Sequence, residues 1–168
     1  HQAYNISTSI AAARKIFNIS DANIKNSMKK MRLKGRLEEI KSGKLKNLIG
    51  ENRLIIDGGH NINSAISISK WVKQQNVKVH LICGMMNDKP HKEFINQFEN
   101  SVNSITLIDI PNQEGSISKE EFKKKLGNKN IHTAESIEES LLMNNKDENC
   151  IFLCAGSLYL AGEVLNLN

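Results

Sequence analysis

Short apolar runs and helically spaced apolar residues alternate along most of the chain. The apolar runs predict strands, with an edge strand at 37–41 and central strands at 53–57, 77–83, 104–110 and 149–154. Apolar spacing and N-cap residues predict helices between and after them, at 63–75 and 91–100 and from Ser118, Ser136 and Ser157. Strands that alternate with helices favour a parallel sheet. The predicted fold class is therefore α/β, with a three-layer, doubly wound and mostly parallel sheet.

The first 34 residues have a different pattern, because they contain two helical segments and no strand. The first helix is expected at 7–17, and Asp21 is expected to cap the second. Two helices are too few to close a hydrophobic core of their own. We therefore expect residues 1–34 to be the end of a domain whose beginning is missing, followed by a hinge at Lys34-Gly35 and a second domain at 35–168.

The first central strand, which follows a polar connection at 42–52, ends in Asp57-Gly58-Gly59-His60-Asn61. Glycines after a parallel strand let the backbone approach a ligand closely, and the start of the next helix favours an anion. Asp57 would accept a hydrogen bond from a hydroxyl or a metal-bound water, His60 would donate near a phosphate, and Asn61 would cap the helix. The alternative is an ordinary turn with a capping Asn and a solvated His.

Three other strand ends carry polar or glycine-containing segments: the loop 84–89, Pro111-Asn112-Gln113 and Gly156-Ser157. The carboxyl ends of parallel strands lie at one edge of a sheet, where α/β proteins bind ligands. We therefore expect these segments and Asp57 to meet in a single cleft.

Composition and charge narrow the class of partner. The net charge of +5 permits binding to polyanions, but the lysines are scattered, and Lys123-Lys124-Lys125 fits a solvated helix face. Nucleic acid is therefore not an expected partner. Cys83, Cys150 and Cys154 lie in apolar runs, which predicts buried free thiols and fits a reducing cytoplasm. No apolar run reaches the roughly 18 residues of a membrane span, so we expect a cytoplasmic protein with no membrane partner.

Five motifs along the chain follow the order of one family. They are His1-Gln2-Ala3-Tyr4-Asn5, Gly35-Arg36-Leu37-Glu38, Asp57-Gly58-Gly59-His60-Asn61, Gly84-Met85-Met86-Asn87-Asp88-Lys89 and Ala155-Gly156-Ser157-Leu158-Tyr159-Leu160. They resemble the H-Q-x-x-N, G-R-hydrophobic-E/Q, D-G-A-H-N, G-x-x-x-D-K and G-S-L-Y elements of folylpolyglutamate synthase and dihydrofolate synthase, in the Mur ligase superfamily. The resemblance implies a Rossmann-like Mur ligase C-terminal glutamate-ligase domain at 35–168, after a helical remnant of the central ATPase domain at 1–34.

The resemblance implies an ATP-dependent ligase that joins L-glutamate to dihydropteroate or a folate, in folate biosynthesis and polyglutamylation, through an acyl phosphate. Arg36 would contact the nucleotide phosphates, for which a guanidinium with its fork of donors is suited. Asp57 would contact the ribose or nearby nucleotide groups, His60 the phosphate side, and Asn5 the adenine. Without the resemblance, Asn5 fits a helix-capping residue equally well.

The glutamate side of the site would be lined by Asp88, Lys89 and Ser157. Their ordinary roles would be a turn cap, a surface ion and a helix N-cap. Three positions depart from the family pattern, since Gly59 replaces an Ala, Ile62 stands where a Pro is frequent, and Pro90 stands where a second Asp often follows.

No G-x-x-x-x-G-K-[ST] motif occurs in the chain. The resemblance therefore implies ATP and Mg²⁺ as cofactors, with the P-loop and the metal ligands in a missing N-terminal and central ATPase part. Two alternatives stay open. One is a Mur ligase domain for a peptidoglycan precursor, whose motif usually has D-Y-A-H. The other is a catalytically inactive fragment or split-gene module that binds nucleotide or a partner. A Rossmann dehydrogenase is disfavoured because G-x-G-x-x-G is absent after the first strand.

Overall fold

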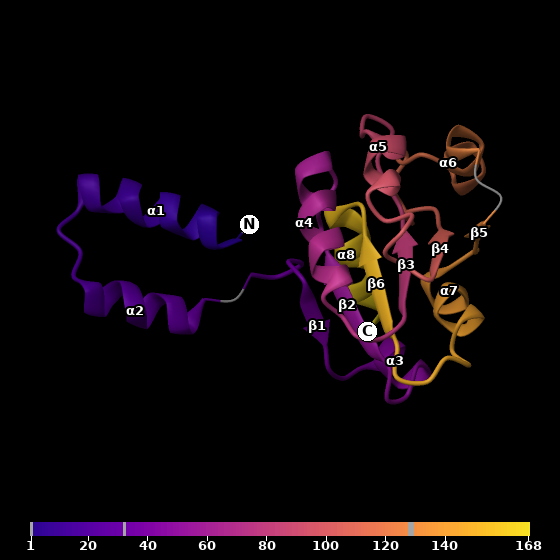
Figure 1. Cartoon of the computed structure of the whole chain (residues 1–168), viewed down its shortest axis with the longest axis horizontal. Coiled ribbons are helices and arrows are strands. Elements are labelled where there is room, and N and C mark those ends of the chain that lie inside the picture. Colours follow the sequence, from indigo (N-terminus) through magenta and orange to yellow (C-terminus); the bar gives the residue numbers. More distant parts are fainter. Residues whose placement is uncertain (1, 32, 128–129) are drawn as a thin grey trace. The chain divides into compact units, whose positions relative to one another are not determined.

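The computed structural model describes residues 2–31, 33–127 and 130–168. The chain divides into two compact units, residues 1–34 and residues 35–168, which we call the helical unit and the sheet domain (Figure 1).

The helical unit contains α1 (Gln2–Ile16) and α2 (Asp21–Lys30). The first helix was predicted to begin at residue 7, and this boundary is wrong. Hydroxyl residues near the expected start continue the helix, because Ser9 Oγ donates a hydrogen bond of 2.9 Å to the carbonyl oxygen of Asn5, one turn earlier. His1, the first residue of the predicted H-Q-x-x-N motif, lies outside the described residues.

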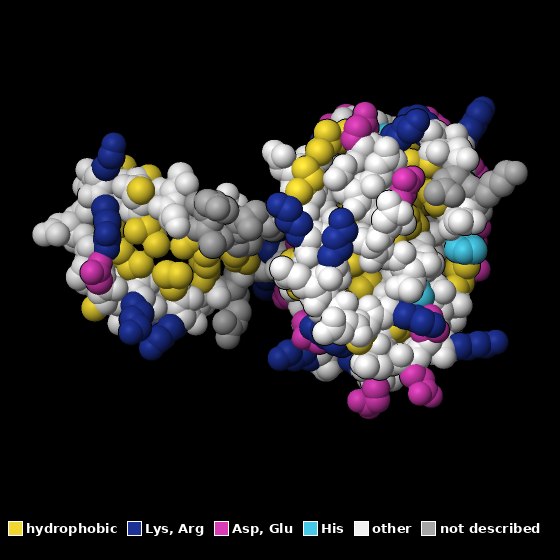
Figure 2. All heavy atoms as spheres, in the orientation of Figure 1, with side chains coloured by type: hydrophobic (Ala, Val, Ile, Leu, Met, Phe, Trp, Pro, Cys, Tyr) yellow, Lys and Arg dark blue, Asp and Glu magenta, His cyan; other side chains and the backbone are white. Residues whose placement is uncertain are grey.

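The prediction that Asp21 caps α2 is also wrong. Ser20 is the cap, since its Oγ accepts a hydrogen bond of 3.2 Å from Asn23 N, whereas Asp21 is the first helical residue and pairs with Arg14. No residue of α2 is buried. Figure 2 shows hydrophobic side chains gathered between the two helices, where a hollow of about 680 Å³ lies. Among its described residues, the helical unit thus has an apolar face and no closed core.

The sheet domain is built on one six-stranded sheet in the order β1-β2-β6-β3-β4-β5. β1 pairs antiparallel with β2, and every other pairing is parallel. The predicted α/β class with a mostly parallel sheet is therefore confirmed. The strands are β1 (Glu38–Ile40), β2 (Arg53–Asp57), β3 (Val79–Cys83), β4 (Ser104–Leu107), β5 (Ile131–Thr133) and β6 (Ile151–Ala155).

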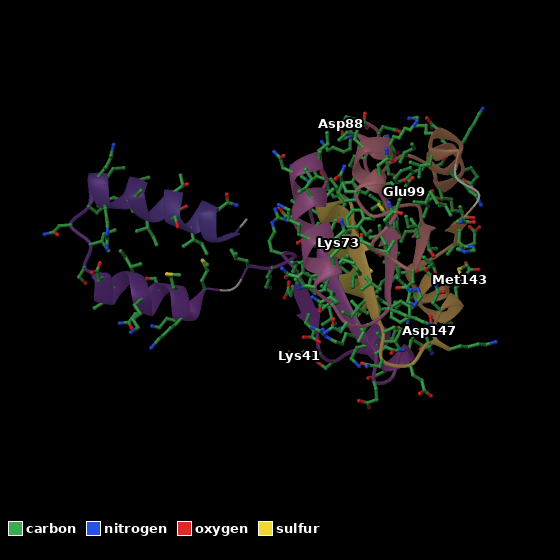
Figure 3. All side chains as sticks on the ribbon, in the orientation of Figure 1. Lys41, Lys73, Asp88, Glu99, Met143 and Asp147 are labelled. Carbon is green, nitrogen blue, oxygen red and sulfur yellow. The ribbon has the colours of Figure 1, made fainter. Side chains whose placement is uncertain are left out.

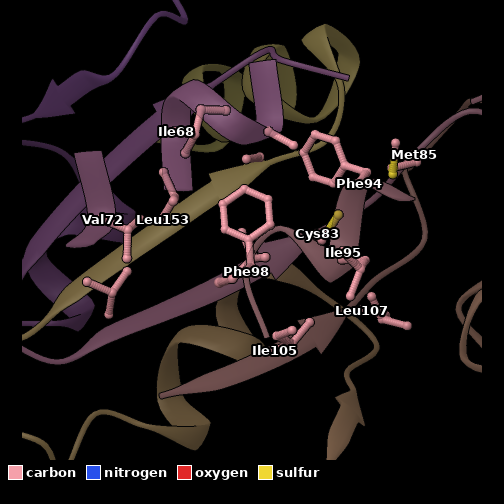
Figure 4. Packing of buried hydrophobic residues seen from close by; sticks show 14 of the residues in the cluster. Ile68, Val72, Cys83, Met85, Phe94, Ile95, Phe98, Ile105, Leu107 and Leu153 are labelled. Atoms are coloured by element: carbon pink, nitrogen blue, oxygen red, sulfur yellow. The ribbon is translucent and has the colours of Figure 1, made fainter. Parts of the chain in front are cut away.

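Helices cover both faces of the sheet and make three layers (Figure 1). One hydrophobic cluster joins the sheet to α4 (Ile62–Lys73), α5 (His91–Asn96) and α6 (Lys119–Leu126), and Figure 4 shows part of it. A second cluster joins the other face to α3 (Lys44–Leu48), α7 (Ile137–Met143) and α8 (Leu158–Leu167). Successive strand residues alternate between the two clusters, so the central strands are buried on both sides.

Some element boundaries differ from the sequence prediction. The connection at 42–52 contains α3, whose Leu45 is fully buried, and β5 was missed because only three residues form it. The edge strand begins at Glu38, one residue later than predicted, because Leu37 adopts a left-handed conformation with φ +46°. Cys83, Cys150 and Cys154 are buried free thiols, as predicted.

The edge where the parallel strands begin is closed by polar groups that pair with one another. His80 is buried, with Nδ1 2.8 Å from Ser104 Oγ and Nε2 3.0 Å from Asp147 Oδ2. Burial lowers the pKa of His80, against the smaller opposing effect of Asp147. Figure 3 shows Asp147 at one end of the sheet domain and Asp88 at the other. The loops that follow the parallel strands, including the one with Asp88, therefore lie at the edge opposite to His80 and Asp147.

Gly156 connects β6 to α8 in a conformation that an L-residue rarely adopts, with φ +117°. A Cβ there would lie 2.8 Å from both Cys83 Sγ and Gly84 O. We expect Gly156→Ala to lower the free energy of unfolding by roughly 2–4 kcal/mol. The matched control is Gly162→Ala inside α8, where a Cβ meets nothing within 4 Å, and which should gain about 0.5–1 kcal/mol.

Urea unfolding of the three proteins measures both effects. Equal changes in the two variants would contradict the close packing described at Gly156.

Candidate functional site

Three loops that follow β2, β3 and β6 meet at the carboxyl edge of the parallel strands. They enclose a cavity of about 280 Å³, which is lined by His60, Met86, Asp88, Lys89, Ser157, Leu158 and Tyr159. The predicted meeting of strand ends is confirmed for these three loops. Residues 111–113, Asp57 and Arg36 are not among the lining residues of this cavity.

Asp57 is the last residue of β2 and is 1% exposed. Its Oδ1 accepts a hydrogen bond of 2.7 Å from Gly59 N, and its Oδ2 accepts one of 2.9 Å from Leu37 N. Burial raises the pKa of Asp57, while these two N–H groups and the charge of Arg36 act in the opposite direction. The carboxylate therefore ties the start of the sheet domain to the loop after β2.

The segment around Arg36 lies against the same loop. Gly58 N donates a hydrogen bond of 2.8 Å to Gly35 O, and Arg36 Nη1 donates one of 3.1 Å to the same oxygen. A Cβ on Gly58 would lie 2.9 Å from Arg36 Nη1 and 2.2 Å from a methyl carbon of Leu158. Glycine thus leaves room for the ends of the Arg36 and Leu158 side chains, which would have to shift for a larger residue. The bond to Gly35 O occupies one of the five N–H donors of Arg36.

His60 projects from the loop after β2 toward the cavity. Its Nδ1 lies 3.0 Å from Gly58 O, which fixes the orientation of the ring, and the residue is half-buried. The next residue, Asn61, caps α4 as predicted, because its side chain accepts from Ser64 N at 2.9 Å and Ser64 Oγ accepts from Asn61 N at 3.1 Å. This reciprocal capping box fixes the end of the loop.

Residues 84–89, which we call the acceptor turn, supply the opposite wall. Lys89 Nζ lies 2.7 Å from Asp88 Oδ2, and this contact lowers the pKa of Asp88, with His60 adding a smaller effect. His91 also contacts this turn, since its Nε2 lies 3.0 Å from Met86 O. Burial lowers the pKa of His91. The cavity therefore carries charges of both signs on one short turn.

Ser157 serves as the N-cap of α8, with Oγ accepting a hydrogen bond of 3.0 Å from Tyr159 N, and it also lines the cavity. Gly156 N donates a hydrogen bond of 3.1 Å to Gly59 O, which joins this loop to the one after β2. Tyr159 and Met86 line the cavity as well, although the sequence analysis assigned them no role. Both residues lie inside motifs that resemble those of the family, at 84–89 and 155–160, and these motifs could have indicated them.

The remaining predicted site residue, Asn5, belongs to the helical unit. Asn5 is exposed and borders the hollow between α1 and α2. Within residues 2–31, 33–127 and 130–168, no three His, Cys, Asp or Glu side chains gather in a way that could hold a metal ion. The same residues contain no helix long and apolar enough to cross a membrane.

Comparisons with known proteins agree with this fold. A curated dihydrofolate synthase/folylpolyglutamate synthase from Buchnera aphidicola is 23% identical over 169 residues, which span 95% of this chain and 38% of that protein. Among solved structures, Escherichia coli FolC in complex with DHPP and ADP matches with a TM-score of 0.77 and 20% identity, over 96% of this chain and 38% of that one.

Mycobacterium tuberculosis folylpolyglutamate synthase complexed with ADP and AMPPCP matches with a TM-score of 0.74 and 16% identity, over 89% of this chain and 35% of that one. These likenesses establish the fold. The chain thus spans little more than a third of the length of the relatives that it matches.

The family described as "Mur ligase, glutamate ligase domain" matches residues 35–158, which is most of the sheet domain. The resemblance inferred from the motifs is therefore confirmed. The chain belongs to the Mur ligase family through its glutamate-ligase domain.

Proposed function

We propose that this chain is the C-terminal part of an ATP-dependent ligase that adds L-glutamate to dihydropteroate or to a folate. The observation that carries the proposal is the cavity at the carboxyl edge, where His60, Asp88, Lys89 and Ser157 meet beside Arg36 and Asp57. The named relatives, two of which have ADP in their complexes, support a folate-type substrate and a nucleotide.

Amide formation from a carboxylate requires activation. ATP transfers its γ-phosphoryl group to the carboxylate to give an acyl phosphate and ADP, and the amine of glutamate then attacks the acyl carbon and releases phosphate. Catalysis of such transfers consists mainly of positioning and charge stabilisation. Within this chain, Arg36 would neutralise phosphate charge, and the buried Asp57 would hold the segment that carries Arg36.

The amino-acid side would be formed by the acceptor turn and the loop after β6. The Lys89 ammonium suits a carboxylate of the incoming glutamate, and the Ser157 hydroxyl supplies a further hydrogen-bonding group. His60 lines the same cavity and would face the phosphate side. The described residues gather no metal ligands, so a phosphate-bound Mg²⁺ would be held by the ATPase part of the ligase. Asn5 would contact the adenine, as the resemblance implies.

One observation favours a second candidate for this polypeptide taken alone. The 168 residues contain no P-loop motif, so the isolated chain lacks the usual cradle for the transferred phosphates. On its own it would be a catalytically silent module that binds nucleotide or a partner domain. A peptidoglycan ligase is less well supported, because Gly58 lies where that group usually has a Tyr.

Phosphate release tests the proposed function directly. ATP and L-glutamate are supplied with dihydropteroate or tetrahydrofolate to this chain alone, and then to this chain with a P-loop-containing ATPase domain from the same family. We expect glutamate-dependent release only in the combined reaction. Absence of glutamate-dependent release from well-folded protein in both reactions would contradict the proposal and favour the silent module.

Arg36 provides a sharper test within the combined reaction. We expect Arg36→Ala to reduce turnover about 100-fold or more, because a donor aimed at transition-state charge is lost. Arg36→Lys should recover part of it, since the charge remains but the fork of donors does not. Arg53→Ala is the matched control, because Arg53 pairs with Glu39 at the surface near the other end of β2, and it should stay within about twofold.

Equal turnover by Arg36→Ala and Arg53→Ala would contradict a role for Arg36 in the site.

A further inference from the structure

Lys119, the first residue of α6, has an unusual environment for a lysine. Its side chain is only 9% exposed. Its Nζ lies 2.9 Å from Glu135 Oε2 and 3.1 Å from Asp109 Oδ2, and its backbone N donates a hydrogen bond of 2.7 Å to Asp109 Oδ1. Lysine is rarely this buried unless it is paired. These carboxylates raise the pKa of Lys119, so the ammonium stays charged at physiological pH.

The partners of Lys119 come from two neighbouring strand exits. Asp109 lies two residues after β4, and Glu135 lies two residues after β5, at the same edge of the sheet as the cavity. Lys119 therefore fastens both ends of the connection that leaves β4 and enters α6. We call residues 109–118 the support loop.

The backbone of the support loop forms hydrogen bonds with the backbone of the acceptor turn. Asn87 N donates a hydrogen bond of 2.9 Å to Gly115 O, and Ile117 N donates one of 3.0 Å to Met85 O. Met86 and Ser116 also form an antiparallel bridge. The turn held in this way places Met86, Asp88 and Lys89 at the wall of the cavity. An unbroken series of contacts thus runs from the Lys119 ammonium to the cavity, although Lys119 does not line it.

We propose that Lys119 is a positioning residue for the amino-acid side of the ligase site, acting through the support loop on Asp88 and Lys89. This inference rests on the proposed function for its substrate, the incoming glutamate. The nucleotide side depends on Arg36, which precedes β1, and on Asp57, the last residue of β2, so we expect Lys119 to affect one substrate and not the other.

Amide hydrogen exchange tests the positioning step on this chain without any enzymatic activity. Lys119→Met keeps the length of the side chain and removes its charge. We expect exchange of the Asn87 and Ile117 amides to accelerate at least tenfold, whereas Leu81 and Leu153 in the central strands keep their rates. Lys119→Arg should restore protection. Lys125→Met is the matched control, because Lys125 forms an exposed ion pair with Glu121 on the same helix.

Milder variants cover the case in which Lys119→Met does not fold. Glu135→Gln and Asp109→Asn each weaken one partner and leave the ammonium in place, and each should accelerate the same two amides less strongly. Wild-type exchange at Asn87 and Ile117 in all three variants would overturn the proposal. Equal acceleration across all amides would also overturn it, because Lys119 would then be a residue of general stability.

The kinetic test uses the combined ligase reaction. We expect Lys119→Met to raise the KM for L-glutamate about tenfold and to leave the KM for ATP unchanged, with Lys119→Arg close to wild type. Equal changes in both KM values would refute a role confined to the amino-acid side. If the wild-type reaction shows no glutamate dependence, the proposed function fails, while the exchange measurement still decides whether Lys119 positions the acceptor turn.

Discussion

The buried carboxylate of Asp57 is the interaction on which the arrangement of the site depends. It receives one backbone N–H from Leu37 and another from Gly59, so a single side chain holds two segments that the sequence separates. Leu37 is kept in a left-handed conformation, with φ +46°, that an L-residue rarely adopts. The loop after β2, the position of Arg36 and the entry into β1 follow from this one group.

The two edges of the sheet are used differently. At the edge where strands begin, the buried His80 ring lies beside Ser104 Oγ and Asp147 Oδ2. At the edge where strands end, glycines allow loops from β2, β3 and β6 to touch, and polar side chains line a cavity. The contrast agrees with the general preference of parallel sheets for ligands at their carboxyl edge.

Much of this arrangement could be predicted from the sequence because it depends on local patterns. The central strands, the N-caps Asn61, Ser118 and Ser136, and the meeting of His60 with Asp88 follow from apolar runs and strand ends. What the sequence could not show depends on distant partners. The contact of Asp57 with Leu37 N, the burial of Lys119 and the three-residue strand β5 are created by neighbours that lie 10 or more residues away along the chain.

Amide hydrogen exchange at Leu37 and Gly59, in the wild type and in Asp57→Ala, tests the role of this carboxylate most directly. We expect both amides to lose their protection together, along with that of Gly58, whose N–H bonds to Gly35 O, while amides of β3 and β6 remain protected. Unchanged protection at Leu37 and Gly59 would contradict the claim that the Asp57 carboxylate holds the site together.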